Sequence, residues 1–210
     1  MPRIIGGVAR GRRLTAPSGT GTRPTSDRMR EGLFSTLMSA YGSLGGVRFL
    51  DLYAGSGSVG LEALSRGAAQ VLLVENDRRA AATIAANVAS VGLPGATIRT
   101  VSVDRLLAYP PDEPYDLVFV DPPYDLPDPH LDGILRLLRG NGWLADDGLA
   151  VVERASRDSA LTWPGAYVSG RSRAYGEGTL WYAQPTLGDA AHAVPGGAET
   201  PCRSDLTTRE

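Results

Sequence analysis

The sequence Asp-Pro-Pro-Tyr at residues 121–124 directly follows an apolar run at residues 117–120. An apolar run of β-branched and aromatic residues that stops at such breakers is typical of a strand covered on both faces, as in a parallel sheet. Neither proline has an amide hydrogen, and the first keeps Asp121 extended, so this turn offers acceptors and almost no donors. Because ligands bind at the carboxyl ends of parallel strands, we expect the turn to face a substrate.

Acceptors in this arrangement suit a substrate amine. The amino group of a nucleobase is a poor nucleophile, because its lone pair is spread into the ring, and it gains positive charge as it reacts. The Asp121 carboxylate and the Pro122 carbonyl could accept its two hydrogens and stabilise that charge, while Tyr124 stacks on the base. The base would have to be unpaired or flipped out of its helix. Taken alone, the tetrapeptide is equally compatible with a plain strand terminus.

A glycine-rich loop at residues 51–60 lies between the first predicted strand and its helix, with the pattern G-x-G-x-x-G at Gly55, Gly57 and Gly60. Glycines there let a ligand approach the backbone. Glu75 ends the next predicted strand, where a carboxylate can hold ribose hydroxyls. Taken alone, these features also fit a dinucleotide, so an NAD-dependent oxidoreductase is a competing interpretation.

Two further carboxylates bear on the choice of cofactor. Asp51, at the exit of the first strand, would repel a pyrophosphate but attract the ammonium and sulfonium charges of S-adenosylmethionine. Asp104, past the third strand, could accept from the amino group of adenine or could simply cap a helix. The glycine loop and the Asp-Pro-Pro-Tyr turn should be neighbours at the switch point of the sheet, where a methyl group and an amine could meet. The pair of motifs therefore favours a methyltransferase, since hydride transfer has no use for the turn.

The elements that position these motifs alternate between strand and helix from residue 47 onward, which predicts a three-layer α/β sheet. The predicted strands are 47–52, 70–74, 96–101, 115–121, 148–153, 166–169 and 179–184, the last two an antiparallel pair at one edge joined by a loop that holds Arg171 and Arg173. The predicted helices are one capped by Thr25 or Ser26 and then 58–66, 77–91, 104–109 and 130–139.

Length and composition set the limits of the assignment. The 210 residues are 42% hydrophobic, enough for one domain with a real core, and no stretch of eighteen apolar residues occurs, so we expect a soluble, cytoplasmic protein without a membrane partner. The single cysteine, Cys202, excludes a disulfide framework, and the isolated His130 and His192 indicate no metal site. We expect an arm or hairpin at 1–22, a catalytic domain at 23–185 and a disordered tail at 186–210.

The charge is unevenly distributed. The net charge is -2, yet residues 1–30 carry seven arginines against one acid, so an acidic body carries a basic arm. Such an arm predicts phosphate contacts and hence a nucleic-acid partner, and we expect that it can be removed without unfolding the sheet. The candidate RNA-binding residues are Arg3, Arg10, Arg12, Arg13, Arg23 and Arg28.

The glycine loop at residues 51–60 and the Asp-Pro-Pro-Tyr turn at residues 121–124 resemble those of the RsmD-type methyltransferases, as do residues 3–14 and the Arg-Pro-Thr-Ser-Asp-Arg segment at 23–28. The resemblance runs from about residue 2 to residue 184. That family methylates the exocyclic N2 of one guanine in bacterial 16S ribosomal RNA, within an assembled small subunit. The resemblance implies a class I S-adenosylmethionine-dependent methyltransferase fold: a Rossmann-like three-layer sandwich around a mostly parallel sheet of seven strands, with a small N-terminal β-hairpin or arm.

The resemblance also implies roles for individual residues. Asp121, Pro122 and Tyr124 would hold the target guanine, and the Arg-Pro-Thr segment would close over the cofactor. The implied cofactor site comprises Thr25, Asp51, Tyr53, Gly55, Ser56, Gly57, Glu75, Asn76 and Asp104. We expect a monomer. Other amines, such as adenine N6 in DNA or a protein glutamine, and a non-catalytic RNA-binding role stay open as alternatives.

Overall fold

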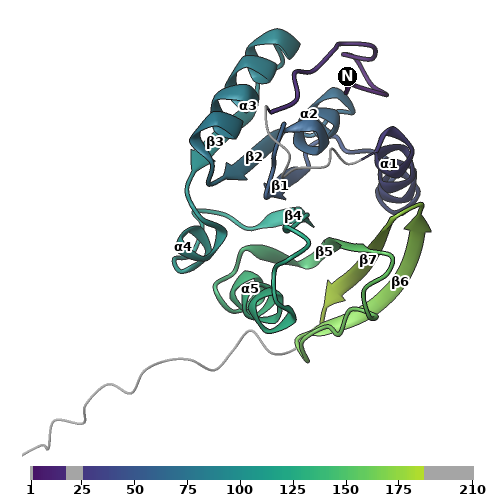
Figure 1. Ribbon diagram of the computed structural model, residues 1–210, viewed down its shortest axis with the longest axis vertical. Helices are drawn as coiled ribbons and strands as arrows, with labels where there is room; N and C mark the ends of the chain where they lie inside the picture. Colours follow the sequence, from purple (N-terminus) through teal and green to yellow (C-terminus); the bar gives the residue numbers. More distant parts are fainter. Residues whose placement is uncertain (1, 18–25, 187–210) are drawn as a thin grey trace, which may run out of the picture.

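The computed structural model describes residues 2–17 and 26–186 (Figure 1). In this part of the chain, the strands form one sheet in the order β3-β2-β1-β4-β5-β7-β6. The strands are β1 (Arg48–Leu52), β2 (Gln70–Glu75), β3 (Ala96–Thr100), β4 (Tyr115–Val120), β5 (Leu144–Ala155), β6 (Tyr167–Tyr175) and β7 (Gly178–Pro185). The helices are α1 (Asp27–Tyr41), α2 (Ser58–Ser65), α3 (Arg78–Val91), α4 (Val103–Leu107) and α5 (Asp128–Gly140).

The first five strands run parallel, and β7 is antiparallel to both β5 and β6. The chain leaves β1 toward β2 on one side and returns to β4 on the other, so the strand order reverses between β1 and β4. This reversal is the switch point of the sheet, and the crevice at its carboxyl edge is where such sheets bind ligands. The predicted class I, Rossmann-like architecture is thus confirmed.

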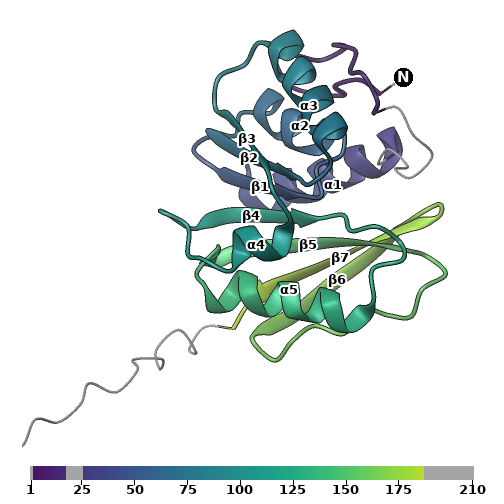
Figure 2. The same cartoon turned by 60° about the vertical axis from the view of Figure 1, so that its left-hand side comes forward.

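Helices cover both faces of the sheet (Figure 2). Helices α1, α2 and α3 pack on one face around Phe34, Phe49 and Ile84, while α4 and α5 pack on the other around Leu107 and Leu135. The inner strands β1 and β4 are therefore covered on both faces, which explains why their sequences are nearly continuous apolar runs, whereas the edge strand β3 stays partly exposed.

Helix α1 begins as its sequence predicts. The side chain of Ser26 is the N-cap and accepts from the amide of Met29, with Asp27 in the first turn; Thr25, the other candidate cap, lies outside the described residues. The apolar side chains of Met29, Leu33 and Leu37 are buried, and so is the charged Arg30. Its guanidinium binds the Asp27 carboxylate at 2.6 Å and the carbonyl of Arg3 at 2.9 Å, so α1 is tied to the N-terminal arm.

Two strands near the C-terminus differ from the prediction. β5 begins at Leu144 rather than 148 and ends at Ala155, and a register shift against β4 between Tyr115 and Leu117 accommodates its early start. β6 extends to Tyr175, so the segment with Arg171 and Arg173 is strand rather than loop. Most of β6 is exposed because it is the edge strand, and an exposed strand carries no apolar alternation from which it could be recognised.

The N-terminal arm, residues 2–17, lies against α2 and α3 (Figure 1). It contains one antiparallel bridge, between Arg3 and Arg13, and its Ile4 and Leu14 are almost fully buried in the core. The arm is therefore a docked segment of the domain with a minimal hairpin. The predicted tail lies outside the described residues beyond residue 186.

Candidate active site

The two predicted motifs meet at the switch point. β1 and β4 are adjacent and in register up to Leu52 and Val120, so Tyr53 and Asp121 leave the sheet side by side. The amide of Asp121 donates to the carbonyl of Leu52 at 3.3 Å, which ties the start of the Asp-Pro-Pro-Tyr turn to the start of the glycine loop. The expected adjacency of the two loops is confirmed.

The glycine loop depends on backbone conformations that other residues rarely adopt. Gly57, the N-cap of α2, has φ 75°, and Gly55 has φ 57°. Tyr53 also has a positive φ of 62°, which costs energy for a residue with a side chain. At Gly60 an added Cβ would lie 2.7 Å from side-chain atoms of Leu73, so this glycine lets α2 pack closely on β2. The loop is thus a preformed, tightly seated turn.

Asp51 lies beneath this loop rather than in its opening. Its side chain is 1% exposed, and Oδ2 accepts from the amide of Gly60 at 2.8 Å. Burial, and to a smaller extent the nearby Asp121 and Glu75, raise the pKa of Asp51 to about 8, although the hydrogen bond from Gly60 opposes the rise. Asp51 thus fixes the loop. Its carboxyl group is largely protonated at neutral pH. The attraction between Asp51 and the cofactor cations that the sequence predicts is therefore weaker than expected.

Glu75 links the glycine loop to β2. Its Oε2 accepts from the amide of Gly55 at 3.0 Å, and its Oε1 accepts from the amide of Asp77 at 2.9 Å. A carboxylate has further lone pairs, so Glu75 can still accept from a ligand hydroxyl. The next residue, Asn76, is exposed at the same edge, whereas Ser56 is buried and accepts through its carbonyl from Asn87 of α3.

Asp104 and His130 form a pair that the sequence did not indicate. Asp104 lies in the first turn of α4, whose N-cap is Ser102, so the alternative of Asp104 as the cap is wrong. His130, expected to be isolated, places Nε2 2.7 Å from Oδ1 of Asp104. Both side chains are about half exposed, at 52% and 43%, so Asp104 stays accessible to a ligand.

The Asp-Pro-Pro-Tyr turn places its residues in different environments. Pro122 is buried and anchors the turn, Asp121 is partly exposed, and Tyr124 is 44% exposed. The guanidinium of Arg157 lies 5.9 Å from the centre of the Tyr124 ring. An accessible ring that already stacks on a planar cation has the surface that an unpaired base requires.

Sequence reasoning missed Glu153, near the end of β5. Val152 pairs with Val120 across β4 and β5, so the next residues, Glu153 and Asp121, are neighbours. Glu153 is 5% exposed, and burial followed by the charge of Asp121 raises its pKa to about 8. One signal was present: Glu153, like Asp51 and Asp121, is an acid at the end of an apolar strand.

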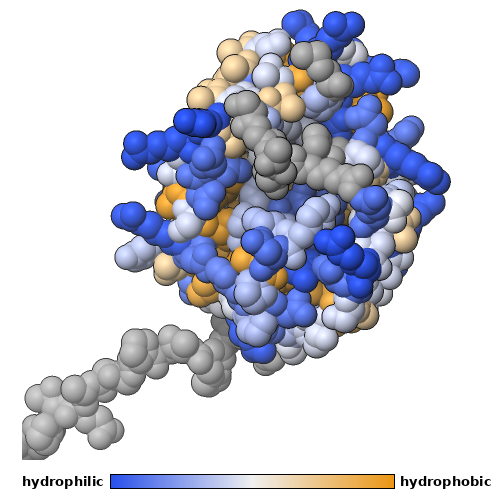
Figure 3. Space-filling model, in the orientation of Figure 1, coloured by the Kyte–Doolittle hydropathy of each residue, from blue (hydrophilic) through white to orange (hydrophobic). Residues whose placement is uncertain are grey.

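Glu62, which the sequence did not single out, holds the arm on the domain. This buried residue of α2 accepts from the amides of Ile5 and Gly6, both at 2.7 Å, and pairs with Arg66 at 2.7 Å. With the arm so fixed, its arginines lie on the surface, and the face in Figure 3 shows hydrophilic side chains projecting on the side where the arm lies.

The predicted RNA-binding arginines differ in their contacts. Arg10, Arg13 and Arg28 are exposed. Arg3 lies 3.7 Å from the Asp27 carboxylate, and Arg12 donates to the carbonyl of Ser90 at 3.2 Å. The remaining candidates, Arg23 for RNA and Thr25 for the cofactor, lie outside the described residues.

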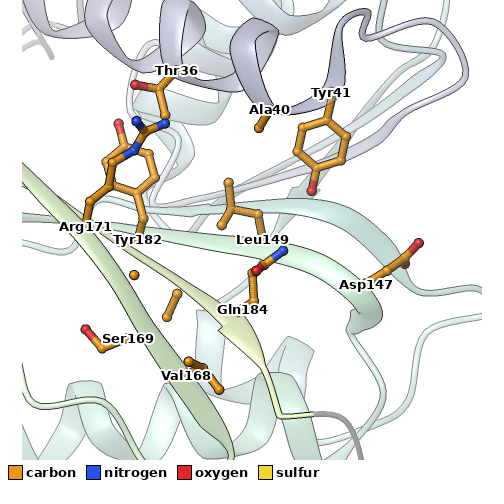
Figure 4. A pocket seen from close by; sticks show the side chains of 12 residues that line it. Thr36, Ala40, Tyr41, Asp147, Leu149, Val168, Ser169, Arg171, Tyr182 and Gln184 are labelled. Carbon is orange, nitrogen blue, oxygen red and sulfur yellow. The ribbon is translucent and has the colours of Figure 1, made fainter.

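A separate hollow of about 380 Å³ lies between α1 and the β5, β7 and β6 side of the sheet (Figure 4). Tyr41, Asp147 and Tyr182 line it, and the guanidinium of Arg171 lies 5.6 Å from the centre of the Tyr182 ring. Asp147 is near the start of β5, so the hollow opens at the opposite edge of the sheet from Asp121. None of the predicted catalytic or cofactor residues that the structure describes lines it.

Comparisons with known proteins agree with this geometry. The family model described as Conserved hypothetical protein 95 matches residues 2–184. The Escherichia coli K12 protein named Ribosomal RNA small subunit methyltransferase D is 39% identical over 175 residues, 83% of this chain and 85% of the relative. The Bacillus subtilis protein named Putative rRNA methyltransferase YlbH is 34% identical, covering 83% of this chain and 94% of the relative.

A solved structure described as Putative methyltransferase yhhF from Escherichia coli superposes with a TM-score of 0.75 at 36% identity, covering 88% of this chain and 97% of that one. The sheet, its switch-point loops and these relatives define the protein as a methyltransferase of the class I, Rossmann-like type. The chain belongs to the RsmD family, over nearly all of the part that the structure describes. The NAD-dependent oxidoreductase and the non-catalytic binding protein are accordingly set aside.

Residues 2–17 and 26–186 contain neither a membrane-spanning helix nor a cluster of metal ligands. No helix in this part of the chain is long and apolar enough to cross a membrane. The same residues contain no group of three or more His, Cys, Asp or Glu side chains arranged to hold a metal ion.

Proposed function

We propose that this protein transfers a methyl group from S-adenosylmethionine to the exocyclic N2 amine of a guanine in 16S ribosomal RNA. The observation that carries the proposal is the junction of the Asp-Pro-Pro-Tyr turn with the glycine loop, where the amide of Asp121 bonds to Leu52. Relatives from Escherichia coli and Haemophilus influenzae named Ribosomal RNA small subunit methyltransferase D support the choice of RNA.

The residues at the edge of the sheet fit S-adenosylmethionine, which consists of adenine, ribose and a methionine with a sulfonium centre. Gly55, which is partly exposed, lets a ligand approach the backbone, and the Glu75 carboxylate, already held by the Gly55 amide, is available to ribose hydroxyls. Asp104 is exposed at the start of α4, where an adenine amino group could donate to it. When bound, the cofactor supplies an electrophilic methyl group.

The Asp-Pro-Pro-Tyr turn handles the amine. Asp121 accepts one hydrogen of the amine and the Pro122 carbonyl accepts the other, which localises the nitrogen lone pair and stabilises the positive charge that develops. Tyr124, 44% exposed, stacks on the flipped or unpaired guanine. After transfer, the extra proton on the nitrogen passes to water or to Asp121.

The basic arm binds the phosphates around the target. Arg10 and Arg13 project from an arm that Glu62 fixes to α2, so the arm is a preformed surface. We further propose that the assembled small subunit is the substrate. We also propose that a single chain acts on it, because both loops of the site come from the same chain.

The test is methyl transfer from tritium-labelled S-adenosylmethionine to 30S subunits that lack their native guanine modifications, followed by nucleoside mass spectrometry. We expect N2-methylguanosine at one position, lost in Asp121→Ala. Asp125→Ala is a matched control, because Asp125 is an exposed acid next to the turn. If no guanosine is methylated, the RNA proposal is wrong, and methylation of DNA adenine or of a protein glutamine by the same preparation would identify the amine instead.

A further inference from the structure

Glu153 lies next to Asp121 because β4 pairs with β5, although the two residues are far apart in the sequence. β4 and β5 are parallel with Val120 opposite Val152, so the residues that follow, Asp121 and Glu153, occupy matching positions at the carboxyl edge. Side chains alternate between the faces of a sheet. Asp121 and Glu153 therefore follow Phe119 and Val151 on the face that α1 covers.

The surroundings of Glu153 are unusual for an ionised group. It is 5% exposed, and its Oε2 receives no hydrogen bond from any residue of the described chain. Gly178 of β7 provides its space, since a Cβ there would lie 3.0 Å from Oε1 of Glu153, and the methyl group of Met29 from α1 adjoins the same position.

Among the charged residues near Glu153, Asp121 is the one that interacts with it. Arg154, the next residue in β5, binds Asp128 at 2.9 Å and Asp158 at 3.3 Å, as expected for a side chain on the other face of the sheet. Asp51 lies on β1 opposite Phe119, and the charge of Asp121 contributes to raising its pKa as well. Of the groups that surround Glu153 on β4, β7 and α1, Asp121 is the one whose charge acts on it.

A buried carboxyl group beside a second, partly exposed one does not ionise together with it at neutral pH, because like charges repel and burial penalises charge. One proton shared by the pair forms a short, charge-assisted hydrogen bond between them. Burial and Asp121 both raise the pKa of Glu153, so the proton belongs on the buried member and the charge on the accessible one.

We propose that Glu153 is a positioning residue for methyl transfer: as a neutral carboxylic acid it donates a hydrogen bond to Asp121 and holds the ionised Asp121 carboxylate toward the substrate amine. The role rests on the proposed function, in which Asp121 accepts from the amine. It assigns Glu153 no contact with the substrate and no proton transfer during the reaction. Glutamine can replace the acid in such a role, since its amide also donates, whereas leucine cannot.

The experiment compares Glu153→Gln and Glu153→Leu across pH 6–10, with Glu113→Gln as a matched control, because Glu113 is an exposed glutamate near the opposite edge of the sheet. For the natural protein we expect kcat to fall as the pH rises past the pKa of Glu153, because the ionised acid no longer donates and repels Asp121. Glu153→Gln should keep kcat at pH 7 and lose this alkaline fall. Glu153→Leu should lower kcat by about 10- to 100-fold, with the KM for the cofactor unchanged.

Two outcomes would overturn the proposal. If glutamine is as damaging as leucine, the charge of Glu153 matters and it acts as a base; if neither substitution alters kcat or the pH profile, the pair has no role in turnover. Thermal unfolding of each variant separates these outcomes from misfolding.

A titration of the carboxyl carbons by ¹³C NMR on the natural chain decides the protonation without any activity. We expect the Glu153 carboxyl to stay protonated at pH 7 and to titrate at a lower pH in Asp121→Asn. An ordinary glutamate titration in the natural chain would refute the shared proton even if ribosomal RNA proves not to be the substrate. Conversely, the expected titration combined with no methylation of RNA would leave the carboxyl pair intact and refute only the proposed function.

Discussion

At the scale of single residues, Asp51 combines a structural contact with an electrostatic cost. Its carboxyl accepts from the amide of Gly60 while burial raises its pKa to about 8. Between about pH 4 and this value the folded state binds more protons than the unfolded state, so the free energy of unfolding falls as the pH rises through that window. The residue that fixes the glycine loop therefore destabilises the protein increasingly toward alkaline pH.

Replacing Asp51 by asparagine should separate these two effects. The amide oxygen can still accept from Gly60, but no charge has to be buried, so we expect Asp51→Asn to unfold at a higher temperature than the natural chain at pH 8, by on the order of 1–3 kcal/mol in stability. At pH 5 the difference should shrink. Calorimetry at both values checks the sign, and an equal difference at the two values would contradict the raised pKa.

The same variant tests the cofactor role of Asp51. If its charge attracts the ammonium or sulfonium group, the affinity for S-adenosylmethionine measured by isothermal titration should fall in Asp51→Asn despite the greater stability. Unchanged affinity would mean that Asp51 contributes only by fixing the loop.

At the scale of elements, the arm is a docked part of the domain, and the buried Glu62 provides two of its hydrogen bonds. Ile4 and Leu14 are almost fully buried, and Glu62 accepts from two arm amides. Burying each such apolar side chain contributes about 1.5–3 kcal/mol. Removal of residues 1–22, which we expect the sheet to survive, should therefore lower the free energy of unfolding, because the deletion would uncover part of the core.

Glu62→Ala should release the arm. It leaves two amides and Arg66 without their acceptor, and breaking such a buried pair costs about 3–5 kcal/mol. We expect a lower unfolding temperature and faster trypsin cleavage in the arm at Arg10, Arg12 and Arg13. Asp132→Ala is the control, because it removes an exposed carboxylate that pairs with Arg136 four residues along α5. Cleavage of the arm no faster in Glu62→Ala than in this control would contradict the assigned attachment.

The elements that the sequence predicted are those whose signal is local. Alternating apolar runs and breakers located the parallel strands, and two short motifs located the loops at their carboxyl ends. The contacts it missed join distant residues: Glu62 to the arm, Asp104 to His130, and Asp121 to Glu153. Each depends on the register of strands or the docking of a segment, neither of which leaves a periodic trace in the sequence. The exposed strand β6 was underestimated for the related reason that it has no buried face.

At the scale of the whole molecule, the net charge of -2 hides an asymmetry that should control RNA binding. The exposed arginines of the arm face solvent on a domain whose remaining charge is acidic, so long-range repulsion of RNA by the body opposes local attraction by the arm. Each phosphate contact releases counterions, which makes the affinity depend on salt.

Charge reversal in the arm tests this balance. We expect Arg10→Glu together with Arg13→Glu to raise the KM for 30S subunits at least tenfold with kcat unchanged at saturation, and to lower the slope of log affinity against log salt by about 1–2. The control is Arg105→Glu together with Arg136→Glu, which makes the same change in total charge at exposed positions on α4 and α5. Because the net charge of the two double variants is equal, a comparable loss in both would show that RNA senses the charge of the whole protein, and that the arm is no specific RNA-binding surface.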